Sequence, residues 1–150
     1  MPELPEVEVV KKSLENQICN LTVKDIKVKD INLRYKVKKH EFNKIIGLKI
    51  LRIERRSKYL LFFFNNDIVM LVHLGMTGKF FISKKKNELQ KTSFYYEIEN
   101  SKHFKHDRII FIFKNNLRLI YNDIRKFGFI KFELKNNIFN NQHIKLLGPE

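Results

Sequence analysis

The residues of this chain best suited to covalent chemistry stand at its N-terminus. The chain opens Met1-Pro2-Glu3, and a small residue such as Pro2 normally allows the initiator methionine to be removed. The exposed ring nitrogen would titrate near ~8, against ~10.4 for a lysine, and so be partly unprotonated at neutral pH. Such an amine can attack a sugar carbon and hold a Schiff base as an iminium ion. We therefore predict that Pro2 is a nucleophile.

Two glutamates accompany this amine. Glu3 is adjacent to it and is placed to act as general acid or base, and Glu6 lies one turn further on. Proline and glutamate are also favoured at helix starts because of backbone geometry and the helix dipole. The segment alone therefore leaves open a purely structural interpretation.

Five further motifs follow at wide spacing. They are Arg55–Leu60 (RRSKYL), His73–Gly78 (HLGMTG), Lys105–Arg108 (KHDR), Asn122–Gly128 (NDIRKFG) and Leu147–Glu150 (LGPE). With Met1–Glu8 (MPELPEVE), these motifs make the chain similar to bacterial formamidopyrimidine-DNA glycosylases. Members of that family excise oxidised purines such as 8-oxoguanine and then cut the abasic site.

The resemblance implies catalytic roles. Pro2 would attack C1′ of the damaged nucleotide, with Glu3 as its acid/base partner and Glu6 as support for the site. Lys58 would assist β-elimination and hold a phosphate, although a lysine in a polar turn is often simply solvated.

It also implies contacts with double-stranded damaged DNA. The residues matching the family's DNA-binding positions are His73, Met76, His106, Arg125, Lys126 and Phe127. Met76, Arg125 and Phe127 would fill the gap left by the flipped-out base. Buried structural roles for the histidines and core packing for Phe127 stay open. The family often has proline at the position of Ile124 and arginine at that of Lys126, and lysine loses the bidentate phosphate geometry of arginine.

In the family, a helix–two-turn–helix segment and a four-cysteine zinc finger follow the motif matched by Leu147–Glu150. We therefore expect residues 1–150 to be one N-terminal catalytic domain without the C-terminal DNA-clamping domain. With Cys19 as the single cysteine, we expect no zinc finger and no cofactor in this chain. We expect impaired activity, and a separate C-terminal polypeptide is one partner that would complete the enzyme.

Periodicity predicts a mainly β fold, a two-sheet β-sandwich flanked by an N-terminal α-helix and a short C-terminal helix. The helix is expected over 2–17 and the closing helix over 139–146, with a mobile polar loop at 83–92. The expected strands span 23–31, 48–54, 59–64, 68–73, 79–82, 94–98, 108–113, 117–121 and 127–134.

Charge limits the function classes. The formal net charge is +14 over 150 residues, which favours a polyanionic partner such as nucleic acid. Abundant lysine and asparagine would also follow from AT-rich coding sequence. With no long apolar segment and no secretion signal, we expect no membrane association and a monomeric, cytoplasmic protein at the nucleoid. The alternatives are a non-catalytic nucleic-acid-binding remnant and a small ribosome-associated protein.

Overall fold

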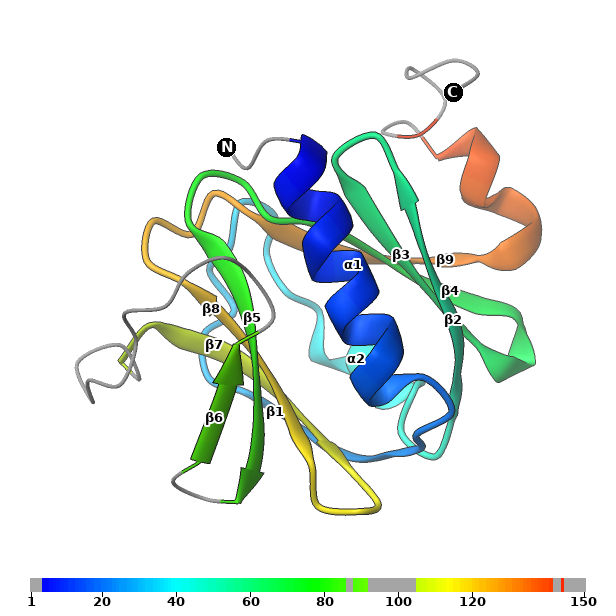
Figure 1. Cartoon of the computed structure of the whole chain (residues 1–150). Coiled ribbons are helices and arrows are strands. Elements are labelled where there is room, and N and C mark those ends of the chain that lie inside the picture. The colour runs from blue at the N-terminus through cyan, green and yellow to red at the C-terminus, as the bar shows by residue number, and fades with distance from the viewer. Residues whose placement is uncertain (1–3, 86–87, 92–104, 142–143, 145–150) are drawn as a thin grey trace.

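The computed structural model describes residues 4–85, 88–91, 105–141 and 144, which form a sandwich of two antiparallel sheets (Figure 1). The elements are α1 (Leu4–Ile18), β1 (Val23–Val28), α2 (Lys39–Asn43), β2 (Ile50–Arg56), β3 (Tyr59–Phe64), η1 (Asn65–Asp67), β4 (Ile68–His73), β5 (Gly78–Lys85), β6 (Glu88–Lys91), β7 (Asp107–Phe113), β8 (Arg118–Asp123), β9 (Phe129–Leu134) and the 3-10 helix η3 (Lys135–Asn140). One sheet has the order β1-β7-β8-β5-β6 and the other the order β2-β3-β4-β9. The expected fold class is confirmed.

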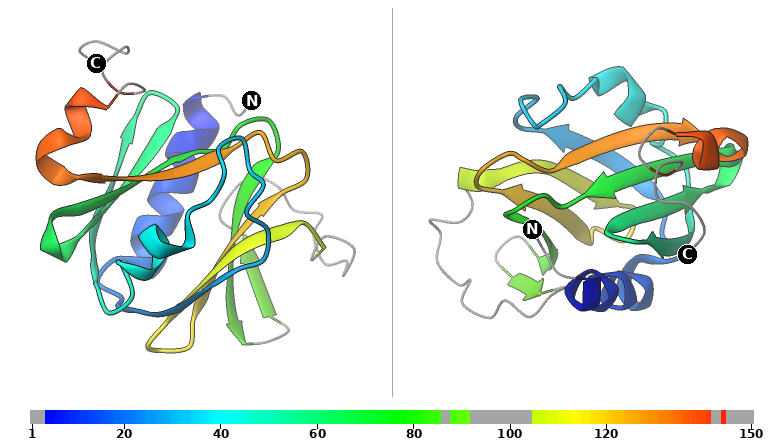
Figure 2. Two further views of the ribbon diagram at one scale, coloured as in Figure 1. Left: turned by 180° about the vertical axis from the view of Figure 1, so that it is seen from behind. Right: turned by 90° about the horizontal axis from the view of Figure 1, so that it is seen from above.

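Helix α1 covers one open side of the sandwich (Figures 1 and 2). Its buried residues Val7, Val10, Leu14 and Ile18 recur every three or four positions, so they form a single apolar stripe. The stripe joins the core that both sheets share. Burial of each such side chain contributes roughly 1.5–3 kcal/mol to the stability of the fold, which holds the helix against the sheets.

Strands β3 and β4 are buried on both faces. Residues Leu60–Phe64 and Val69–His73 are all less than a tenth exposed. One face enters the main core, and the other packs under η3 against Ile138 and Ile144. The hairpin turns at 65–67 and 115–116 place Asn66 and Asn116 in the left-handed region that asparagine tolerates.

Several expectations need correction. The loop expected at 83–92 is largely strand, because β6 pairs with β5 in the register Ser83↔Leu89. A lysine-rich segment is compatible with an edge strand, where charge opposes aggregation. The 3-10 helix η3 overlaps the start of the closing helix expected over 139–146, Ile144 is helical, and residues 142, 143, 145 and 146 lie outside the described residues. No sequence pattern predicted α2. The strand expected at 94–98 lies outside the described residues.

No helix among the described residues is long and apolar enough to cross a lipid bilayer.

Candidate functional site

One end of the molecule collects the segments that carry the sequence motifs. This end lies in the upper half of Figure 1 and of the left view of Figure 2, and it holds the start of α1, the β2–β3 turn, the β4–β5 turn and the β8–β9 turn. The predicted residues Glu6, Lys58, Met76 and Arg125 come from these four segments. Pro2 and Glu3 lie outside the described residues, immediately before α1.

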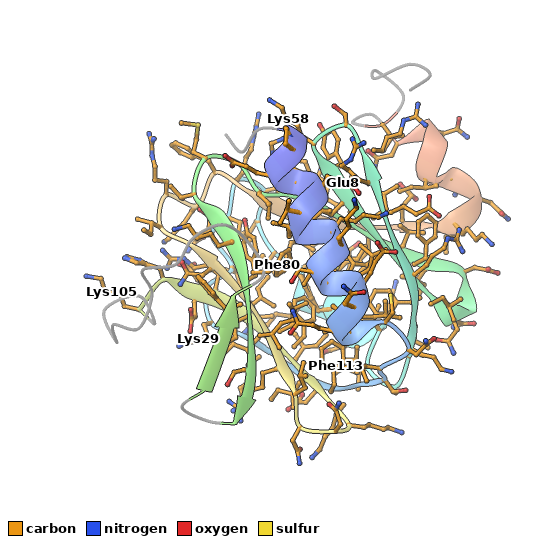
Figure 3. The ribbon with its side chains drawn as sticks, in the orientation of Figure 1. Glu8, Lys29, Lys58, Phe80, Lys105 and Phe113 are labelled. Atoms are coloured by element: carbon orange, nitrogen blue, oxygen red, sulfur yellow. The ribbon has the colours of Figure 1, made fainter. Side chains whose placement is uncertain are left out.

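The β2–β3 turn is tied to α1 by an ion pair. Arg55 donates from Nε to Glu8 Oε1 at 2.6 Å and from Nη1 to the carbonyl oxygen of Ser57 at 3.0 Å. The hydrogen bond from Arg55 lowers the pKa of Glu8, against the opposing effect of desolvation. Figure 3 shows Lys58 beside the first turn of α1, where Glu6 is half-buried. The anchored turn therefore holds Lys58 close to the residue at which the N-terminal segment enters the helix.

The β4–β5 turn presents Met76, whose side chain is 50% exposed. Gly75 has φ +64°, and Gly78 donates its N–H to Leu74 O at 2.7 Å. A Cβ at Gly78 would lie 2.2 Å from that oxygen, so the tight turn excludes any side chain there. The glycines of the motif thus place a large apolar side chain on an exposed tip.

The β8–β9 turn presents Phe127, which is 45% exposed, so core packing is not its role. The Arg125 guanidinium carbon lies 4.7 Å from the centre of the Phe127 ring, in cation–π contact. Arg34 lines a surface hollow together with Gly75, Met76 and Phe127. The two turns therefore bring Met76 and Phe127 to one hollow, and their joint role in filling a gap in the duplex stays a prediction.

A buried carboxylate links the two turns. Asp123, at the end of β8, is 0% exposed. Its Oδ1 accepts hydrogen bonds from Thr77 Oγ1 at 2.6 Å and Lys126 N at 3.1 Å, and its Oδ2 accepts from Tyr121 Oη at 2.8 Å and Gly128 N at 3.0 Å. Sequence reasoning did not single out Asp123. The only signal was an acidic residue at the end of an apolar strand within the motif.

Lys126 takes part in an internal charge cluster. Its Nζ lies 2.7 Å from Asp30 Oδ2, to which Arg108 Nη1 also donates at 3.2 Å. The pKa of Asp30 is lowered, first by the hydrogen bond from Lys126. Arg108 Nε in turn donates to Asp123 O at 2.9 Å, and His106 Nδ1 lies 3.5 Å from Arg108 Nη2. In this structure the Lys126 ammonium faces Asp30, and this partner was not foreseen from the sequence.

His73 is only 6% exposed. Its ring stacks on Phe129 at a centroid distance of 5.5 Å and meets the Tyr59 ring edge-on at 5.0 Å, and its Nδ1 accepts the Gly75 N–H at 3.0 Å. The packing fixes the ring and supports the β4–β5 turn. A DNA contact by His73 stays a prediction.

Among the described residues, no group of three or more His, Cys, Asp or Glu side chains could hold a metal ion. Burial raises the pKa of the Cys19 thiol, with a further upward effect from Glu15. A raised pKa disfavours the thiolate, which is the reactive form of a cysteine.

The chain thus folds as a helix-flanked sandwich of two antiparallel sheets that presents basic and apolar turns at one end. Residues 1–130 match the family described as formamidopyrimidine-DNA glycosylase N-terminal domain, and the chain belongs to this family.

The similar proteins include two named formamidopyrimidine-DNA glycosylase. That of Rickettsia bellii (strain OSU 85-389) is 40% identical over 130 residues, covering 87% of this chain and 42% of the relative. That of Rickettsia massiliae (strain Mtu5) is 39% identical over 150 residues, covering 100% and 48%. The chain thus spans about half the length of these relatives.

Solved structures agree. The Lactococcus lactis Fpg in complex with DNA containing an abasic site has a TM-score of 0.80 and 29% identity, covering 99% of this chain and 50% of that one. The same values of TM-score, identity and coverage hold for the wild-type L. lactis Fpg (MutM) with DNA containing an oxidised pyrimidine. Both confirm the resemblance first seen in the sequence motifs.

Proposed function

We propose that this chain is the catalytic part of a bifunctional DNA glycosylase and abasic-site lyase that acts on oxidised purines in double-stranded DNA. The observation that carries the proposal is the pairing of exposed Met76 and Phe127 at one hollow, at the end of the molecule where α1 begins. Family membership and the DNA bound to the similar solved structures support it.

The proposed chemistry starts at Pro2. Covalent geometry keeps Pro2 within about 7 Å of Leu4, the first residue of α1, because only two residue steps separate their Cα atoms. The free ring nitrogen would attack C1′ of the damaged nucleotide and break its bond to the base, which leaves with a proton. The C1′–O4′ bond would then break, with O4′ taking up a proton, as the iminium ion forms. Glu3 would transfer the proton, and Lys58, beside the first turn of α1, would hold a phosphate and assist elimination.

The exposed turns would support the extruded nucleotide. Flipping a base out of the stack costs a few kcal/mol. Met76 and Phe127 would enter the space it leaves and recover part of that cost. Arg125, stacked on Phe127, would remain close enough to the strand to use its planar guanidinium on a base edge or phosphate.

The remaining basic residues would contact the backbone. His106 is half-buried next to Arg108. Lys126 would have to exchange Asp30 for a phosphate, since its ammonium faces Asp30 in this structure. His73 would act mainly by shaping the β4–β5 turn.

The length of the relatives bears on affinity. This chain spans about half of them, so phosphate contacts made by the other half of such a protein are not supplied by these residues. Each lost contact weakens binding at physiological salt, often by orders of magnitude in sum. We propose that a polypeptide matching that other half would raise the activity of this chain, which would work as a monomer at chromosomal DNA.

Borohydride trapping tests the proposal. The purified chain is incubated with an abasic-site oligonucleotide at low salt, and borohydride reduces any Schiff base to a stable adduct. We expect an adduct with the wild-type chain and a strongly diminished one with Pro2→Gly, in which a primary amine replaces the proline ring nitrogen. Pro5→Gly is the matched control, because it removes a proline of the same segment without touching the terminal nitrogen.

Two results would contradict the enzymatic function. One is no adduct from the wild type, even with the C-terminal half of a relative added. The other is an undiminished adduct from Pro2→Gly. DNA binding without any adduct would favour a non-catalytic basic binding module, which the net charge of +14 would support. Intact mass provides a separate check, since Met1 must be absent for the chemistry to occur.

A further inference from the structure

The Asp123 carboxylate is enclosed by donors from two different turns. Thr77 belongs to the β4–β5 turn, while Lys126 and Gly128 belong to the β8–β9 turn, and Tyr121 lies on β8. Four donors converge on two oxygens of a side chain that is 0% exposed. A buried carboxylate is costly unless it is hydrogen-bonded in this way, so the arrangement holds all four donors in place.

Thr77 carries the connection one step further. Its hydroxyl donates to Asp123 Oδ1 at 2.6 Å and accepts the Arg125 N–H at 2.9 Å. Because the hydroxyl proton is committed to the carboxylate, the oxygen lone pairs are left for Arg125. Asp123 therefore orients the residue that precedes Lys126 and stacks on Phe127.

The backbones of the two turns are also in direct contact. A Cβ at Gly75 would lie 2.6 Å from Gly128 N and 2.7 Å from the Phe127 carbonyl carbon. At this separation the turn of Met76 cannot move toward that of Phe127, and the Asp123 hydrogen bonds prevent it from moving away. The contact and the hydrogen bonds together set one distance between the two tips.

From this geometry, and on the basis of the proposed function, we propose that Asp123 is a positioning residue for base extrusion. It joins the β4–β5 and β8–β9 turns into one rigid wedge, so that Met76 and Phe127 enter the duplex together. Asp123 itself, fully buried, touches no DNA. Loss of the Asp123 carboxylate should remove the preference of the protein for a duplex with a gap in its base stack. The electrostatic attraction of the protein to DNA phosphates should stay intact.

Asp123→Asn is the direct test, because an amide keeps the shape and loses one acceptor. An NH2 group at the Oδ2 position faces the Gly128 N–H, and at the Oδ1 position it faces the Lys126 N–H. Either orientation leaves one backbone donor of the β8–β9 turn without its acceptor. Asp67→Asn is the matched control, since it makes the same charge change at an exposed position in η1.

The full chain is titrated with two duplexes, one intact and one carrying a tetrahydrofuran abasic analogue, with 2-aminopurine beside the analogue. For the wild type and Asp67→Asn we expect preference for the tetrahydrofuran duplex and a rise in 2-aminopurine fluorescence as the stack opens. For Asp123→Asn we expect the preference to fall about tenfold and the rise to be lost. Affinity for the intact duplex should stay within about twofold, whereas partial unfolding would lower both affinities.

A second pair of variants covers a failure of Asp123→Asn to fold. Thr77→Val removes the linking hydroxyl and should reduce the preference, and Thr77→Ser should restore it. The proposal is overturned if a folded Asp123→Asn, or Thr77→Val, keeps both preference and fluorescence. It is also overturned if the wild type shows no fluorescence rise. Trapping of a single-stranded abasic oligonucleotide, which needs no wedge, then reports separately on the Pro2 chemistry.

Discussion

Replacement of Gly128 by alanine measures how tightly the two turns are joined. The added Cβ would lie 2.0 Å from Tyr121 Oη, 2.7 Å from His73 O and 2.9 Å from Asp123 Oδ2, whereas ordinary contact begins at 3.4 Å. The Tyr121 hydroxyl would have to move by 3.4 − 2.0 = 1.4 Å, which would break its 2.8 Å hydrogen bond to Asp123. Tyr121 is fully buried, so it has no free direction in which to move.

The size of the effect follows from these contacts. Overpacking a close-packed site costs about 1–3 kcal/mol. Loss of a hydrogen bond to a charged group costs about 1.5–3 kcal/mol. We expect Gly128→Ala to lower the free energy of unfolding by about 4 kcal/mol, which for a chain of this length lowers Tm by about 8–16 °C.

Gly47→Ala is the comparison variant. Gly47 has φ +90° and no heavy atom within 4 Å of an added Cβ, so alanine there costs only backbone strain of about 1–2 kcal/mol. Urea unfolding followed by circular dichroism gives both free energies. If Gly128→Ala lowers the free energy of unfolding no more than Gly47→Ala does, the inference that Tyr121, His73 and Asp123 pack tightly around Gly128 is refuted.

Three further predictions concern DNA contact and pH. Met76→Ala should change stability by less than about 0.5 kcal/mol, because the side chain is half exposed, yet abolish the 2-aminopurine response; an unchanged response would exclude insertion by Met76. Arg125→Ala should reduce the slope of log affinity for DNA against log salt concentration by about the amount due to one phosphate contact, and Lys126→Ala should reduce it by less, because Lys126 faces Asp30. Fluorescence anisotropy titrations between about 50 and 200 mM salt measure both slopes. Equal slopes for the two variants would refute the difference. Asp107→Asn should be more stable than the wild type at pH 7, because burial raises the pKa of Asp107 above its ordinary 3.8 and the folded protein therefore binds this proton more tightly. As pH falls through that raised pKa, the free energy of unfolding of the wild type should approach that of Asp107→Asn. A difference between the two proteins that does not change with pH would contradict the assignment.

The N-terminal helix and most strands were predictable from sequence because their signals are local, and the motifs were recognisable because each is a short run of residues. The apolar stripe of α1 depends only on the 3.6-residue period, and β3 and β4 are recognisable as short apolar runs between polar turns. The exposure of Met76 followed from the glycines on either side of it, which specify a tight turn. The prediction of a loop at 83–92 was wrong because the pairing of an edge strand depends on its neighbouring strand and not on apolar character.

The sequence by itself determined which residues could do chemistry and that an N-terminal helix precedes a series of strands. Only the tertiary structure decided which of these residues meet. Asp123 is sequentially distant from Thr77, and Arg108 from Asp30, yet each pair is hydrogen-bonded. Such contacts arise from the order of strands in the two sheets, which no local pattern encodes, so the buried link between Met76 and Phe127 became visible only in three dimensions.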